Sequence, residues 1–150
     1  MKFIADLHVH SHFSRATSRS LDPEHLALWG KKKGITLIGT GDVTHAGWLS
    51  ELQDRLIEAE NGLYRLKPEL ETSIEREVPA SCQKPARFLL SGEISCIYKR
   101  GGKTRKLHHL ILMPNMDAAF RLNKKLDRIG NLSSDGRPIL GLDSRDLLEI

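Results

Sequence analysis

The sequence is poor in cysteine and has no long apolar run, and each shortage excludes a class of protein. The two cysteines, Cys82 and Cys96, are too few for a disulfide framework, which favours a reducing compartment. No apolar run approaches the roughly 18 residues of a membrane span, so we expect no membrane association. Asp6 would interrupt the apolar segment of a signal peptide. We therefore expect a cytoplasmic protein.

A large excess of charge of one sign is also lacking. Charged residues make up 28% of the chain and hydrophobic residues 39%, a balance that favours a folded domain over a disordered chain. A chain of 150 residues is long enough for one domain with its own core. The net charge of +4 permits a phosphate-bearing partner but does not require one.

Apolar segments alternate with segments of helical periodicity. We expect strands over residues 3–9, 35–40, 87–93, 107–113 and 139–142. We expect helices that begin at Asp22-Pro23, after the loop 41–47, at Asn115, and at Asp143 or Ser144. This alternation predicts an α/β fold with βαβ units and a parallel sheet.

Three of these expectations concern where elements end. Leu49, Leu52, Leu56 and Ala59 have helical spacing, so we expect the second helix to continue to Gly62. By the same spacing, we expect the helix after Asn115 to continue to Gly130. Residues 67–86 hold three prolines and no periodicity, which predicts a long irregular excursion.

Three histidines alternate in the run Asp6-Leu7-His8-Val9-His10-Ser11-His12. Residues two apart in a strand point to the same side, so His8, His10 and His12 would share one face where the first strand ends. Grouped imidazoles suit zinc, manganese or iron. The alternative is a surface strand with solvated histidines.

Other possible metal ligands follow the later strands. They are Asp42 and His45 after the second strand, Glu93 after the third, and His108 and His109 on the return strand of a hairpin. Carboxyl ends of parallel strands form sites together, so we expect one locus that binds two or three divalent ions. Asp42 and Glu93 are also candidate catalytic residues. His108 and His109 point to opposite sides of a strand, and the periodicity does not decide which one faces inward.

The first histidine run, Asp6-Leu7-His8-Val9-His10-Ser11, resembles the first motif of the PHP (polymerase and histidinol phosphatase) superfamily. The segments 8–18, 39–48 and 135–138 resemble more specifically its endonuclease Q-like branch. The resemblance implies a distorted (βα)7 barrel, up to three divalent metal ions and hydrolysis of phosphoesters. The ions would be zinc, manganese or iron, with magnesium as a further possibility. Members of the branch nick DNA on the 5′ side of deaminated or otherwise damaged bases.

The resemblance also implies roles for single residues. His8 and His10 match the first pair of metal ligands, Glu93 matches a bridging glutamate, and His108 or His109 matches the next histidine. Asp42 and His45 fall at the second motif, where the inserted Val43-Thr44 leaves open which of the two binds metal. Arg15 stands where many relatives have an acidic residue or a histidine, so its predicted role is catalytic contact with a phosphate.

The family's late histidine and its closing Asp-x-His pair find no match before Ile150. We therefore expect residues 1–150 to form a PHP-like metal-dependent phosphoesterase domain that is incomplete at its carboxyl end. Such a fragment could also bind metal or nucleic acid without cleaving it.

Cationic side chains surround the predicted site, in the loop after the first strand and on the expected hairpin. They are Arg15, Arg19, Lys99, Arg100, Lys103, Arg105 and Lys106. A basic hairpin can lie along a nucleic-acid backbone, whereas a solvated edge of a sheet carries similar charges without any partner. With the resemblance, these residues predict DNA as the partner, and a small phosphorylated substrate is the alternative.

Overall fold

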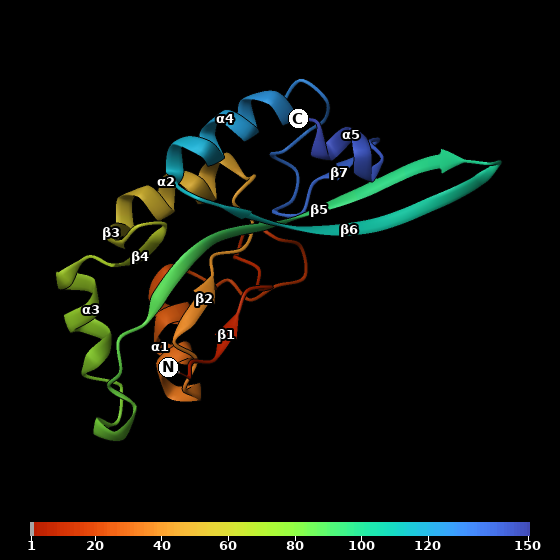
Figure 1. The fold of residues 1–150 in the computed structure, drawn as a ribbon. Helices are drawn as coiled ribbons and strands as arrows, with labels where there is room; N and C mark the ends of the chain where they lie inside the picture. Colours follow the sequence, from red (N-terminus) through yellow and green to blue (C-terminus); the bar gives the residue numbers. More distant parts are fainter. Residues whose placement is uncertain (1) are drawn as a thin grey trace.

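The computed structural model describes residues 2–150 and contains a mixed α/β fold (Figure 1). The strands are β1 (Ala5–Asp6), β2 (Leu37–Gly39), β3 (Leu56–Glu60), β4 (Leu63–Leu66), β5 (Arg87–Arg100), β6 (Lys103–Met113) and β7 (Ile139–Leu140). The helices are α1 (Pro23–Lys33), α2 (Ala46–Arg55), α3 (Pro68–Glu75), α4 (Met116–Leu126) and α5 (Ser144–Leu148), with a short 3₁₀ helix, η1, at Ala80–Cys82.

The seven strands form one open sheet. Its order is β1-β2-β5-β4-β3, and β5 also pairs with β6 and β7. The strands β1, β2, β5 and β7 pair in parallel, while β3, β4 and β6 are antiparallel to their neighbours. The prediction of an α/β fold is therefore confirmed. The expected parallel sheet is mixed, and the strands within residues 2–150 do not close into a barrel.

The first strand is shorter and more exposed than expected. It was predicted over residues 3–9, but β1 is only Ala5–Asp6 at the edge of the sheet, and Phe3 and Ile4 are 63% and 59% exposed. The chain beyond Asp6 therefore runs past the end of the sheet as a loop, and this loop carries the histidines.

The prediction that the second helix continues to Gly62 is wrong. Helix α2 ends at Arg55, and the next five residues form strand β3, which pairs antiparallel with β4. Leu56 is already extended, with φ −106° and ψ 151°. The signal that was missed is the dipeptide Asn61-Gly62, which is typical of hairpin turns.

Two other predicted boundaries need correction. Residues 67–86 are not wholly irregular, because α3 begins at Pro68, a residue favoured in the first helical turn. Ile74 of this helix is buried, and Lys31 of α1 forms ion pairs with Glu71 and Glu75. Helix α4 begins at the predicted cap, Asn115, but ends at Leu126 rather than near Gly130.

Other local predictions are confirmed. Asp22 caps α1 with its carboxylate, and Gly34 ends that helix in the left-handed conformation at φ 74°. Asp143 caps α5. Strands β5 and β6 form the expected hairpin, whose far end extends away from the remainder of the chain (Figure 1).

No helix within residues 2–150 has both the length and the apolar character that crossing a membrane would require.

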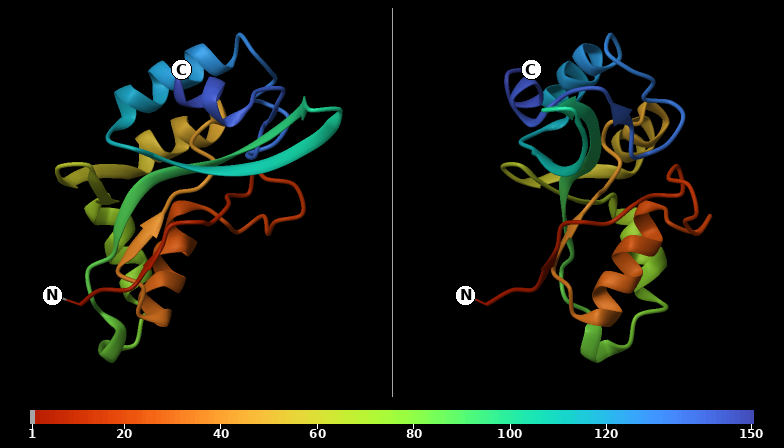
Figure 2. Two further views of the ribbon diagram at one scale, coloured as in Figure 1. Left: turned by 45° about the vertical axis from the view of Figure 1, so that its right-hand side comes forward. Right: turned by 90° about the vertical axis from the view of Figure 1, so that its right-hand side faces the viewer.

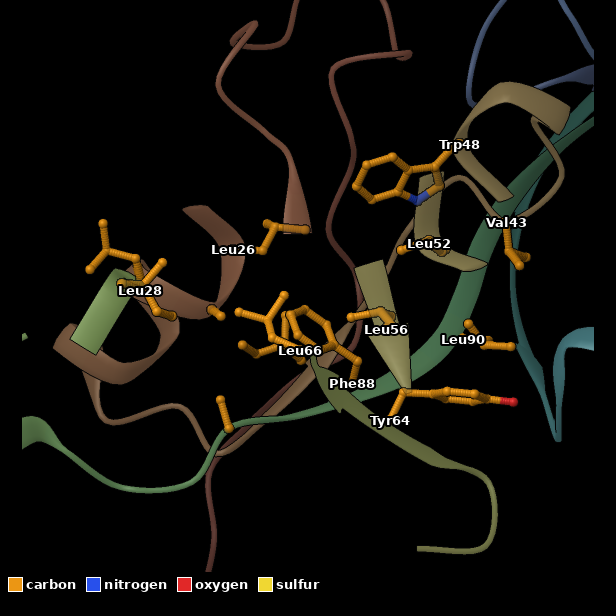
Figure 3. Close-up of a cluster of buried hydrophobic side chains, with 14 of the residues drawn as sticks. Leu26, Leu28, Val43, Trp48, Leu52, Leu56, Tyr64, Leu66, Phe88 and Leu90 are labelled. Carbon is orange, nitrogen blue, oxygen red and sulfur yellow. The ribbon is translucent and has the colours of Figure 1, made fainter. Parts of the chain in front are cut away.

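The main core lies between the sheet and helices α1, α2 and α3. In Figure 3, Phe88, Leu56 and Leu66 point toward one another, with Leu26 from α1 beside them. A smaller cluster around Ile94, Cys96, Leu126, Leu132 and Leu140 fixes the carboxyl-terminal segment to β5. Figure 2 shows α1 beside α3 at one end of the molecule and α2 beside α4 at the other. Because both clusters pack on β5, this strand holds the two ends together.

Candidate metal centre

Glu93 lies at the centre of a group of imidazoles. Its Oε2 is 2.6 Å from Nε2 of His8 and 3.6 Å from Nε2 of His10. One ligand atom from each of these three residues can be chosen so that all lie within 4.8 Å of one another. Glu93 is only 4% exposed, whereas the side chain of His8 is 52% exposed. The group is therefore buried on the side of Glu93 and open to solvent on the side of His8.

His108 joins this group from the return strand of the hairpin. Its Nδ1 is 2.7 Å from Oε1 of Glu93, so the two carboxylate oxygens face imidazoles from different parts of the chain. His108 pairs with Ser95, two residues from Glu93, so alternation puts its side chain on the face that carries Glu93. His109 lies on the opposite face, where its Nε2 is 3.0 Å from Oγ of Ser144.

Asp42 is fully buried beside the group. Its Oδ2 accepts hydrogen bonds from the backbone N–H and hydroxyl of Ser11 and from the hydroxyl of Ser14. Its Oδ1 is 3.1 Å from Nδ1 of His10. Burial by itself raises the pKa of the Asp42 carboxyl, but the hydrogen bonds from His10, Ser11 and Ser14 outweigh it and lower that pKa below its ordinary value. Asp42 is therefore held as an ionised carboxylate.

Close backbone packing keeps these loops in place. A Cβ atom on Gly39 would lie 2.4 Å from the carbonyl oxygen of Leu7, and one on Gly41 would lie 2.3 Å from that of Val9. The loop that carries His8 and His10 can therefore approach the end of β2 only because these positions are glycine. Trp48, fully buried in α2, donates its indole N–H to the carbonyl oxygen of Gly41 at 2.8 Å.

Two of the predicted histidines do not join the group. His12 was expected to share a face with His8, but its Nε2 is 3.2 Å from Oε2 of Glu51 on α2. The strand has already ended at Asp6, and His12 lies in a turn, so alternation of side chains does not place it with His8. His45 caps the amino end of α2 through Nδ1, and its Nε2 is 3.3 Å from the carbonyl oxygen of Ser133.

The cationic residues predicted to contact nucleic acid are mostly exposed. Arg15 is 76% exposed and its Nε is 3.8 Å from a carboxylate oxygen of Asp135. At the end of β5, the side chain of Arg100 pairs with Asp143 and lies over the ring of Tyr98, with 5.7 Å to the ring centroid. The remaining predicted contacts are also exposed: Arg19, Lys99, Lys103, Arg105 and Lys106.

The sequence did not indicate the partners that hold these groups. Ser11 and Ser14 bind Asp42, Glu51 binds His12, and Ser144 binds His109. Ser11 and Ser14 are close in sequence to His10, so a search for hydroxyl residues near the histidines could have found these two partners. The partners Glu51 and Ser144 are 39 and 35 residues from their histidines, so local pattern could not identify them.

No family model matches the chain. An uncharacterised protein of Methanocaldococcus jannaschii is 29% identical over 146 residues, which are 97% of this chain and 14% of that protein.

Two solved structures match with a TM-score of 0.74 and 27% identity. One is the lesion-specific endonuclease PfuEndoQ from Pyrococcus furiosus, of which the match covers 30%. The other is Endonuclease Q in complex with a 27-mer duplex substrate that has an abasic lesion at the active site, of which it covers 31%. Each match covers 97% of this chain. The chain therefore has an Endonuclease Q-like fold and spans about a third of the length of those enzymes.

Proposed function

We propose that this chain is a PHP-type metal-dependent phosphodiesterase domain that acts on DNA, nicking it 5′ of deaminated or damaged bases. The observation that carries the proposal is the convergence of His8, His10 and His108 on the buried carboxylate of Glu93. Likeness to a lesion-specific endonuclease supports the same activity.

The donor set fits a divalent ion. Imidazole nitrogens and a carboxylate oxygen suit zinc, manganese or iron, and the open side of the group leaves room for a substrate oxygen. When bound, such ions supply Lewis-acid polarisation of a phosphate oxygen and activation of water at neutral pH. The proposed ligands are His8, His10, Glu93 and His108. Their placement on three separate segments makes the site dependent on the folded state.

The chain's own cations would bind the DNA backbone. Arg15 is exposed in the loop that follows the proposed ligands, and Arg105 and Lys106 are exposed on β6, three and two residues from His108. Contacts from such residues to phosphates position a duplex without reading its sequence. We propose that Arg15 and Lys106, which shares the His108 face of β6, place a phosphodiester bond against the open side of the group, while Arg105 lies on the other face of the strand.

The test combines metal content with cleavage. We expect the purified protein to hold zinc, manganese or iron by elemental analysis. We also expect it to nick duplex DNA that contains uracil, hypoxanthine or an abasic site, and a chelator to abolish the nicking. Undamaged duplex of the same sequence is the control.

Two other results would replace the proposal. Hydrolysis of a small phosphomonoester with no action on any DNA would assign a PHP-type phosphatase. Metal binding and salt-dependent DNA binding without cleavage would assign a non-catalytic module, a result compatible with a chain that spans only 30% of PfuEndoQ.

A further inference from the structure

Asp42 lies beside the proposed ligands, yet both of its carboxylate oxygens already have partners. Three donors from Ser11 and Ser14 lie 2.7 to 2.8 Å from Oδ2, and Nδ1 of His10 lies 3.1 Å from Oδ1. Each carboxylate oxygen offers about two acceptor positions, so the three donors fill Oδ2, while Oδ1 accepts from His10. The side chain is also fully buried.

These contacts determine which nitrogen of His10 carries the proton. A carboxylate can only accept hydrogen bonds, so Nδ1 of His10 must donate. In a neutral imidazole the other nitrogen, Nε2, is then unprotonated, and this is the atom 3.6 Å from Glu93. We propose that Asp42 is a positioning residue rather than a metal ligand: it fixes the ring of His10 so that Nε2 faces the metal. The inference rests on the metal site of the proposed function.

The surroundings prevent the carboxylate of Asp42 from turning away. A Cβ atom on Gly136 would lie 2.3 Å from both Cγ and Oδ2 of Asp42, so the segment around Gly136 closes over the carboxylate. Asp42 itself has a positive φ of 47°, and its carbonyl oxygen accepts from the backbone N–H of His45 at 2.9 Å. These contacts hold the carboxylate in its position beside His10, which suits a group that orients another.

The substitution Asp42→Asn separates positioning from ligation. The backbone N–H of Ser11 can only donate, so it would take the amide oxygen of the new side chain. The amide NH₂ would then face Nδ1 of His10 and donate to it, which puts the imidazole proton on Nε2. Loss of an outer hydrogen-bond partner of a metal ligand typically costs about 10–100-fold in metal affinity.

Two measurements test this without any nuclease assay. Long-range ¹H–¹⁵N correlation spectra of the metal-free protein, under mildly alkaline conditions, should show His10 protonated on Nδ1 in the wild type and on Nε2 in D42N. The variant H10Q identifies the signals. Calorimetric titration with Zn²⁺ should show binding weakened by about 10–100-fold in D42N.

A second aspartate–histidine pair provides the control. Nδ1 of His25 on α1 is 2.8 Å from Oδ1 of Asp22, the cap of that helix, and neither residue is a proposed ligand. Asparagine is also a good helix cap, so D22N should fold and bind Zn²⁺ with the wild-type affinity.

The possible outcomes divide clearly. Two results with the wild-type protein would overturn the proposal even if D42N does not fold. One is that His10 is protonated on Nε2, and the other is that Zn²⁺ displaces the Nδ1 proton of His10. Unchanged zinc affinity in a folded D42N would also overturn it. Positive results in a protein that cleaves no DNA would support the role of Asp42 and refute only the proposed function.

Discussion

His8 and Glu93 are 85 residues apart in sequence, yet Nε2 of the first lies 2.6 Å from Oε2 of the second. His8 is in the loop after the edge strand β1, and Glu93 is in the middle of β5. The two residues meet because β1, β2 and β5 are adjacent and parallel, so loops after the first two strands extend over the third.

Replacement of Glu93 with glutamine should remove bound metal. Glutamine keeps the shape of the side chain but lacks the charge that a divalent ion requires, so we expect metal affinity to fall by more than about 100-fold, beyond the loss typical of an outer partner. Elemental analysis after gel filtration measures the loss. The control is E60Q, since Glu60 is exposed and pairs with Arg87. Full metal content in E93Q would rule out Glu93 as a ligand.

His108 and His109 should differ when each is replaced with alanine. His108 contacts Glu93 at 2.7 Å, so H108A should bind less metal. His109 contacts Ser144 on the other face, so H109A should keep its metal and lose only about 1 kcal/mol of stability, the usual contribution of one hydrogen bond. Metal titration and urea denaturation measure the two effects. The opposite pattern would mean that the strand register is shifted by one residue.

Removal of two cations from the hairpin should reduce the salt dependence of DNA binding. Each phosphate contact contributes about 0.9 to the slope of log K against log salt, so R105A/K106A should lower that slope by up to about 1.8. Binding is measured by fluorescence anisotropy over a series of salt concentrations. R76A/K84A removes two exposed cations elsewhere and should leave the slope unchanged. Equal slopes in all three proteins would argue against a role for the hairpin.

Alanine at Gly39 should destabilise the fold. Its Cβ would lie 2.4 Å from the carbonyl oxygen of Leu7 and 2.6 Å from Oγ of Ser91, and backbone atoms cannot move aside cheaply. We expect a loss of about 1–3 kcal/mol in the free energy of unfolding, as for other overpacked sites. Urea denaturation measures this loss. A Cβ atom on Gly141 would have no heavy atom of residues 2–150 within 4 Å apart from its chain neighbours, so G141A should unfold at the wild-type urea concentration.

The two cysteines should react with thiol reagents at different rates. Burial raises the pKa of the Cys96 thiol, with a smaller contribution from Asp143, and the side chain is fully buried. A buried thiol with a raised pKa forms little thiolate, the reactive species, so Cys96 should react only after denaturation. Cys82 is partly exposed and should react in the native protein. Absorbance during reaction with a disulfide reagent distinguishes them, and C82S should lose the fast phase. A fast phase that persists in C82S would contradict the packing of β5.

Local signals in the sequence were sufficient for elements whose ends are fixed by short-range chemistry. Asp22-Pro23 and Gly34 bound α1, Asn115 caps α4, and Asp143 caps α5, because caps depend on a few neighbouring residues. The helical spacing from Leu49 to Ala59 led to a wrong prediction, because an apolar residue such as Leu56 fits the buried face of a helix by its spacing but is buried here in a strand. Pairing with β4 decided between the two.

The sequence by itself determined which residue types could form the centre: the alternating His8 and His10, and the acidic Glu93 within an apolar strand. Only the tertiary structure decided which imidazoles reach Glu93. His12 and His108 show why, since the first turns away to Glu51 and the second arrives from a different strand. The physical reason is that a site built from three segments depends on strand order and register, and these are set by packing between residues far apart in the chain.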